Sequence, residues 1–186
     1  MGISNKLVLF DFLLKEFGYK RFEDLQGKFS DEELRYDVSE KSQFFTTLVG
    51  KADLKITPSD LKRYDDNIVK HLADINAKRQ LKINLKYYQY LSLLFTERYL
   101  DLYFKDKAAL AERLTQFVNH IGLYINDYPK YLFLFDKVKD KENGNRKQID
   151  DFRFTEDDLN IIAYWQATGS GKTFTLHFNI LQYKSY

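Results

Sequence analysis

The sequence predicts a mainly α-helical region over about residues 1–150, followed by the first strand, loop and helix of an α/β domain. Three observations support this fold class. Apolar residues recur at helical spacing up to about residue 125, and a short run of β-forming residues follows at Leu159–Trp165. A glycine-bearing turn joins that run to a final helical segment. We therefore expect a helical accessory domain at 1–150 and the beginning of an α/β domain at 151–186.

The first expected helix begins after Ser4, a residue type suited to the N-cap, and ends at Gly18. Its apolar residues repeat three and four positions apart, as on one face of a helix. They are Phe10, Leu13, Leu14 and Phe17.

The sharpest local signal is the sequence Thr57-Pro58-Ser59-Asp60. Thr57 can cap a helix, Pro58 suits the first helical position, and Asp60 places negative charge where the helix dipole favours it. These residues predict a helix that runs to about Ala77.

Two further helices are expected at Leu85–Phe104 and Lys107–Tyr124, and a polar loop at 137–147. Leu159–Trp165 has the composition of a buried strand, and Phe174–Tyr183 that of a helix. A parallel strand returns only after a crossover of about a dozen residues or more. The α/β domain is therefore expected to be incomplete within these 186 residues.

Composition narrows the class of protein. With 44% hydrophobic and 30% charged residues the chain can bury a core, and without cysteine it has no disulfide, thiolate zinc site or cysteine nucleophile. The lack of cysteine also leads us to expect a cytoplasmic protein. The apolar run 7–14 is interrupted by Asp11 and is far shorter than a membrane span, so we expect no membrane partner. Residues 61–147 carry 17 basic against 11 acidic side chains, but mostly with alternating sign, which alone is weak evidence for nucleic-acid binding.

One motif carries recognisable chemistry, the turn Gln166-Ala167-Thr168-Gly169-Ser170-Gly171-Lys172-Thr173. Glycines allow a tight turn whose backbone N–H groups converge on phosphate oxygens, and the following helix adds its positive N-terminal end. Lys172 would reach the β- and γ-phosphates, and the Thr173 hydroxyl would bind Mg²⁺. Residues 168–173 are thus the expected phosphate-binding residues. An ordinary strand-to-helix turn is the alternative.

The sequence Ala-Thr-Gly-Ser-Gly-Lys-Thr resembles motif I of superfamily 2 helicases and translocases. With Tyr164-Trp165-Gln166 before it, it is most similar to the DEAD/DEAH-box ATPases grouped with restriction-enzyme motor subunits. It departs from the general phosphate-loop pattern in having Gln166 where a glycine is usual. The resemblance implies a RecA-like lobe, ATP and Mg²⁺ as cofactors, and DNA as partner. It also implies an ATP hydrolase acting as a helicase or translocase in restriction or phage defence, with restriction or defence subunits as possible partners.

These motors also resemble one another in a glutamine that reads the adenine edge. The best match is Gln89 in the sequence Leu85-Lys86-Tyr87-Tyr88-Gln89. Because 83 residues separate Gln89 from Lys172, this assignment requires a helical insertion between them. Gln148 is the second candidate, and an ordinary polar residue on an amphipathic helix is an equal interpretation of Gln89.

The resemblance also implies parts that these residues lack. Hydrolysis needs an Asp-Glu pair on a second strand and arginines from a second lobe. Neither lies in the 13 residues after Thr173. We therefore expect an N-terminal fragment of a motor, inactive alone. The alternative is a stand-alone helical interaction module with a vestigial phosphate loop. Two Asp-Leu-Lys triplets, at 53–55 and 60–62, resemble nuclease motifs but are expected by chance in such a chain.

Overall fold

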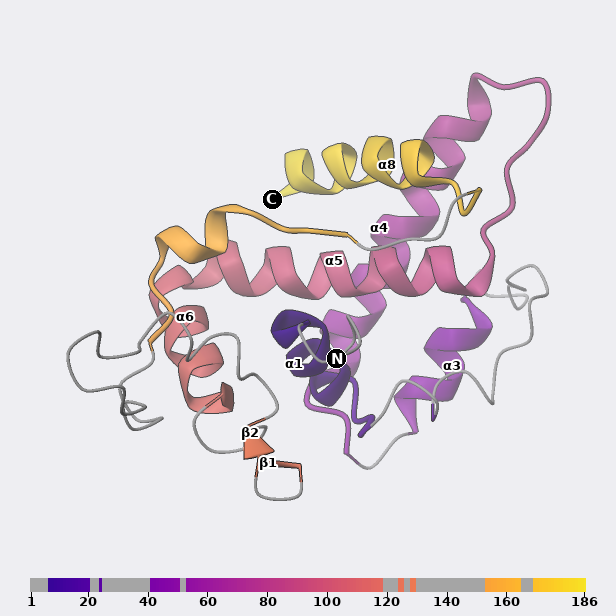
Figure 1. The fold of residues 1–186 in the computed structure, drawn as a ribbon. Coiled ribbons are helices and arrows are strands. Elements are labelled where there is room, and N and C mark those ends of the chain that lie inside the picture. Colours follow the sequence, from indigo (N-terminus) through magenta and orange to yellow (C-terminus); the bar gives the residue numbers. More distant parts are fainter. Residues whose placement is uncertain are drawn as a thin grey trace. The chain divides into compact units, whose positions relative to one another are not determined.

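The computed structural model describes residues 7–20, 24, 41–50, 53–118, 124–125, 128–129, 153–164 and 169–186. These residues are mostly helical, which confirms the predicted helical character (Figure 1). The α-helices are α1 (Val8–Glu16), α3 (Gln43–Val49), α4 (Pro58–Ala77), α5 (Tyr87–Lys105), α6 (Lys107–Gln116) and α8 (Lys172–Ser185). A 3₁₀ turn, η4, covers Asp157–Asn160. The two-residue strands β1 (Tyr124–Ile125) and β2 (Tyr128–Pro129) pair antiparallel.

The chain forms two compact units. One contains Met1–Phe12 and Lys105–Ala163, and the other contains Leu13–Phe104 and Tyr164–Tyr186. The division expected near residue 150 does not coincide with a boundary between these units. The assignment of 1–150 and 151–186 to an accessory domain and a motor lobe stays a prediction.

Helix α5 is the centre of the larger unit. Residues 93–100 are buried on every side of the helix, which is typical of a helix enclosed by its neighbours. Phe17, just after α1, stacks on Phe95 with ring centroids 4.9 Å apart. The Arg98 guanidinium donates to the Glu16 carboxylate at 2.7 Å, so the end of α1 is fixed to α5 by a buried ion pair as well as by packing.

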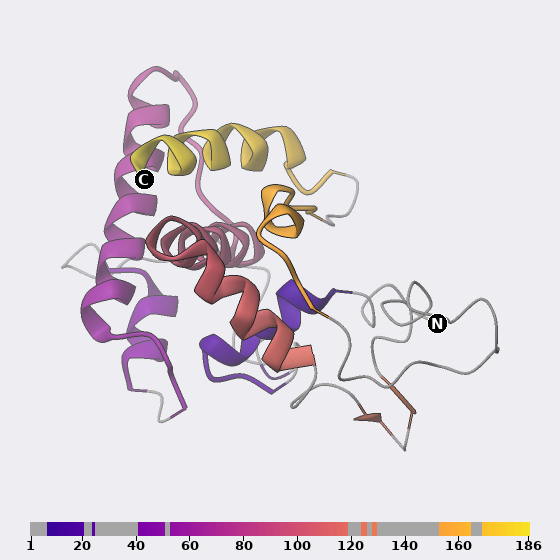
Figure 2. The same ribbon diagram turned by 90° about the vertical axis from the view of Figure 1, so that its left-hand side faces the viewer.

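Helices α4 and α8 cover further sides of α5. Tyr64 of α4 donates to Asp101 of α5 at 2.5 Å, and Gln182 of α8 donates to the Leu93 carbonyl at 2.9 Å. Figures 1 and 2 show α8 crossing α5 and α4. The larger unit is therefore a helical cluster built on α5.

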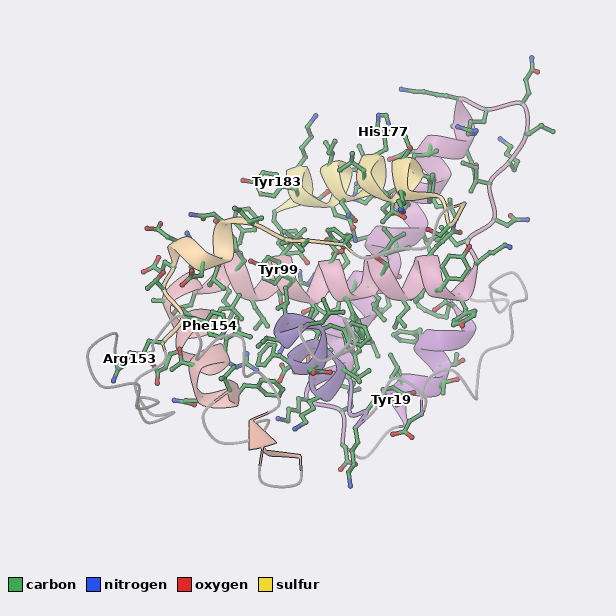
Figure 3. The ribbon with its side chains drawn as sticks, in the orientation of Figure 1. Tyr19, Tyr99, Arg153, Phe154, His177 and Tyr183 are labelled. Atoms are coloured by element: carbon green, nitrogen blue, oxygen red, sulfur yellow. The ribbon has the colours of Figure 1, made fainter. Side chains whose placement is uncertain are left out.

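The smaller unit contains α6, the β1–β2 pair and η4. Phe12 and Phe117 pack edge to face with centroids 5.7 Å apart, and Arg113 lies over the Phe12 ring. The Phe154 N–H donates to the Thr115 hydroxyl at 3.0 Å, which joins the segment before η4 to α6. Figure 3 labels Arg153 and Phe154 in this segment.

Most predicted helices are confirmed with small shifts in their ends. The helix from Pro58 to Ala77 is found at its predicted bounds, and α5 begins two residues later than expected. Gly18 follows α1 in the left-handed region, at φ 75°. The N-cap expected at Ser4 and the loop at 137–147 lie outside the described residues.

The helix predicted over Lys107–Tyr124 is too long. Helix α6 ends at Gln116, and Tyr124 lies in β1. Tyr124, Ile125 and Tyr128 have high β-propensity and flank Asn126-Asp127, residue types favoured in tight turns. The local preference for a hairpin therefore replaces the helical periodicity there.

The strand predicted at Leu159–Trp165 is not found. Leu159 lies in η4, closed by hydrogen bonds from the Thr155 N–H and hydroxyl to Asp158, both at 2.8 Å. Ile161 has extended backbone angles, but 161–164 pair with no strand among the described residues, and Trp165 lies outside them. Without a neighbouring strand, an apolar run of this length has no ladder hydrogen bonds to make it a strand.

Candidate functional site

The glycine-bearing turn leads directly into helix α8. Gly169 and Gly171 both have left-handed backbone angles, with φ of 82° and 90°. Helix α8 begins at Lys172, two residues before the predicted start, and Gly171 is its N-cap without a side chain to bind the first N–H groups. The side chains of Lys172 and Thr173 are exposed. The start of α8 thus presents a cation, a hydroxyl and helix N–H groups at the surface of the protein.

Gln89 lies against this turn. Its Nε2 donates to the Ser170 carbonyl at 3.0 Å, a contact between residues 81 positions apart in the sequence. A Cβ atom on Gly171 would lie 2.8 Å from the same nitrogen. Two features therefore favour glycine at position 171: its positive φ angle and the close approach of the Gln89 amide.

Gln89 also stabilises the start of its own helix. Its Oε1 accepts from the Lys86 N–H at 3.0 Å. Since α5 begins at Tyr87, Lys86 occupies the N-cap position and Gln89 the third helical position, which is the glutamine half of a capping box. An amide has two N–H groups and two acceptor lone pairs, so one of each is left after these two bonds. That is the pair needed to bind an adenine edge.

The structure thus brings together Gln89, Ser170 and Gly171 from the predicted site, with Lys172 and Thr173 next in the chain. Thr168 and the alternative glutamine, Gln148, lie outside the described residues. Among the described residues, no group of three or more His, Cys, Asp or Glu side chains is placed to hold a metal ion.

The opposite end of α8 is fixed by a buried carboxylate that sequence reasoning missed. Glu97 of α5 is fully buried, and it accepts hydrogen bonds from three side chains on two other segments. The donors are Asn67 at 3.1 Å, Gln182 at 2.8 Å and Tyr186 at 3.0 Å. Burial raises the pKa of Glu97, although these hydrogen bonds act to lower it.

A second contact on the same side of α8 involves His71 of α4. The Ser185 hydroxyl and His71 Nε2 are 3.1 Å apart, and the His71 ring packs edge to face on Phe178. Burial lowers the pKa of His71. In the sequence, Gln182 lies at helical spacing from Thr175 and Phe178, on the buried face of α8. A polar residue on that face could have indicated a buried polar contact.

The outer side of α8 differs from this buried side. His177 projects there, and Leu176, Ile180 and Tyr183 are 63%, 45% and 58% exposed (Figure 3). Tyr183 also packs against Phe104 at the end of α5, with ring centroids 5.4 Å apart.

The second Asp-Leu-Lys triplet already has structural roles. Asp60 accepts from Thr57 and Arg63 near the start of α4, and Lys62 pairs with Asp66 one turn further on. The Thr57 hydroxyl lowers the pKa of Asp60. These contacts account for both charged side chains of the triplet without a nuclease site.

No helix in the described part of the chain combines the length and apolar character needed to cross a membrane. Comparison of the chain with protein-family models, curated proteins and solved structures finds no match.

Proposed function

We propose that the turn at 168–173 and the start of α8 bind the phosphates of ATP in an ATP-dependent DNA motor of the helicase or translocase type. The observation that supports this most is the contact between Gln89 and the Ser170 carbonyl. The turn was expected to bind phosphate from its own residues, and Gln89 was expected to read adenine from the family resemblance. They meet across 81 positions of sequence.

The local geometry fits a phosphate group. Two glycines in the left-handed region permit the tight turn that a phosphate-binding loop needs, and α8 begins beside them with the positive end of its dipole. Lys172 would neutralise charge on the β- and γ-phosphates, and the Thr173 hydroxyl would bind Mg²⁺. The remaining N–H and lone pair of Gln89 would face the adenine edge.

Cleavage of the bond to the γ-phosphate supplies the free energy for movement along DNA. In this proposal the described residues hold the nucleotide. The proposal assigns none of these residues to the acidic pair and the arginines that hydrolysis also needs. The setting in restriction or phage defence, and subunits of such systems as partners, are part of the same proposal and rest on the resemblance alone.

A helical interaction module is the second candidate. The observation that favours it is the exposed apolar row of Leu176, Ile180 and Tyr183 on the outer side of α8. In that case the protein would bind a partner through α8, and nucleotide would have no effect on it.

Calorimetric titration with Mg-ATP separates the two candidates. Replacing Lys172 with alanine removes a charge-assisted contact of about 1.5–3 kcal/mol, so affinity should fall about 10- to 100-fold. Lys184→Ala is the matched control, since Lys184 is an exposed lysine near the other end of the same helix. Equal affinities of the wild type and Lys172→Ala, with both folded by circular dichroism, would refute phosphate binding by this turn.

A further inference from the structure

The connection between α4 and α5 carries a concentration of positive charge. Lys78, Arg79, Lys82 and Lys86 lie in this short segment, and no acidic residue occurs from 75 to 96. Elsewhere in the basic part of the chain, opposite charges alternate. This segment is the exception, with four cations and no intervening anion.

All four basic side chains are available at the surface. Each is exposed, and none takes part in an ion pair with another described residue. Figure 3 shows the side chains of this connection extending outward from the ribbon, several of them tipped with nitrogen. Cations on a helical face are usually balanced by neighbouring carboxylates, as Lys62 is by Asp66. The absence of such balance here leaves a local positive field.

The connection is also held in a defined conformation. The Asn76 side chain accepts from the Ile83 N–H at 2.8 Å and donates to the Ile83 carbonyl at 2.9 Å, which ties the two sides of the loop together. Lys82 donates to the Asn76 carbonyl at 2.6 Å, and Leu85 is almost fully buried. The four cations are thus presented by a fixed loop, so their ordering costs less on binding.

The same loop leads into the candidate nucleotide site. The Lys86 N–H donates to Gln89, and Gln89 in turn donates to the Ser170 carbonyl. A ligand bound along the loop would therefore lie next to the turn that begins α8.

We propose that the loop of Lys78, Arg79, Lys82 and Lys86 binds the phosphate backbone of DNA. Neighbouring cations without carboxylate partners match a polyanion, and phosphate contacts of this kind position nucleic acid without reading its sequence. An anionic membrane is a poorer fit, because binding at a membrane interface needs a broad apolar face. In this loop the strongly exposed apolar side chain is that of Leu81, which does not make such a face. The choice of DNA rests on the proposed motor function, whereas the location of the surface does not.

The test is fluorescence anisotropy of labelled duplex and single-stranded DNA with the full chain, without nucleotide and at several salt concentrations. The variant K78Q/R79Q/K82Q/K86Q removes the four charges. The control K20Q/K55Q/K105Q/K184Q removes four exposed lysines elsewhere, so the net charge is the same. Each phosphate contact contributes about 0.9 to the slope of log K against log salt on duplex DNA. Going from about 50 to about 200 mM salt, the wild type should lose about 100-fold more affinity than the loop variant. The control should keep the wild-type slope.

Three results would overturn the proposal: no binding of the wild type at low salt, equal loss of affinity in the two variants, or binding to phosphatidylserine vesicles without binding to DNA. Lys172→Ala, tested with DNA in this assay and with Mg-ATP by calorimetry, separates this inference from the proposed function. If Lys172→Ala leaves nucleotide binding intact, the phosphate-site assignment fails and the loop surface stands. If Lys172→Ala abolishes nucleotide binding while the loop variant binds DNA like the wild type, the phosphate-site assignment stands and the loop proposal fails.

Discussion

Helices α4 and α8 begin in opposite ways. At the start of α4 the Thr57 hydroxyl accepts from the Asp60 N–H at 3.1 Å, Pro58 occupies the first turn, and Asp60 places negative charge near the helix end. Ser42 and Asp106 cap α3 and α6 in the same manner. Helix α8 begins at Gly171, which has no side chain to offer.

The difference indicates what each helix end does. The first N–H groups of any helix need an acceptor from outside the helix. At α4 that acceptor is supplied locally, so the end is complete in the folded chain. At α8 it is left to water or to a ligand, and the glycines, Lys172 and Thr173 all suit an anion. The starts of α3, α4 and α6 are each capped by a side chain, whereas the start of α8 has no side-chain cap and, in our proposal, is left for a ligand.

An uncapped helix must be held in place by other contacts, and Glu97 provides them for α8. Glu97→Ala would leave the half-buried Asn67 amide without its carboxylate acceptor and weaken the contacts of Gln182 and Tyr186. We expect the free energy of unfolding to fall by about 2–3 kcal/mol, measured by urea denaturation. Glu112→Ala on the exposed face of α6 is the control and should change it by less than about 0.5 kcal/mol. A small effect of Glu97→Ala would mean that α8 is held mainly by apolar packing.

Alanine substitutions of the two turn glycines measure how closely Gln89 approaches the turn. Gly169 and Gly171 have similar positive φ angles. Alanine at either position places a Cβ in the left-handed region, which should lower the free energy of unfolding by about 1 kcal/mol. Only at Gly171 does the new Cβ meet Gln89; at Gly169 it meets nothing within 4 Å. Gly171→Ala should therefore cost about 2 kcal/mol in all. Equal costs by thermal denaturation would show that the Gln89 contact is loose. In a Gln89→Ala background the excess at Gly171 should disappear.

The smallest effect is expected at the capped end of α4. Thr57→Ala removes the acceptor for the Asp60 N–H and should cost about 1 kcal/mol. The Thr57 hydroxyl also lowers the pKa of Asp60 below its ordinary 3.8, so the wild type gains stability above that pH and loses it as the pH falls through the lowered pKa. The variant should lose less stability between neutral and acid pH. Denaturation at several pH values tests this, and parallel pH profiles would contradict the role of the cap.

The contrast between α4 and α8 also explains which features could be predicted from the sequence. The start of α4 depends on four consecutive residues, so its bounds were predictable from local chemistry. The anchor of α8 depends on Glu97 and Gln182, 85 positions apart, and no local pattern reports such a pairing. Gln89 was identified through a resemblance, but its capping of α5 and its contact with Ser170 required the fold.

The error at Leu159–Trp165 has a similar origin. An apolar run of that length is compatible with a strand, but a strand exists only where another strand pairs with it. Thr155 and Asp158 supply a local alternative by closing a 3₁₀ turn at the beginning of the run. Side-chain to backbone hydrogen bonds of this kind compete directly with strand pairing.

In our proposal the start of α8 binds nucleotide phosphates beside Gln89. The most direct measurement is a titration of the isotope-labelled 22.2 kDa chain with Mg-ATP, following backbone and side-chain amide signals by NMR. We expect the largest shifts at Gly169, Gly171, Lys172 and Thr173 and at the Gln89 side-chain amide, with the Asp60 amide unchanged at the capped end of α4. No shifts at saturating nucleotide, or shifts centred away from the start of α8, would contradict the claim.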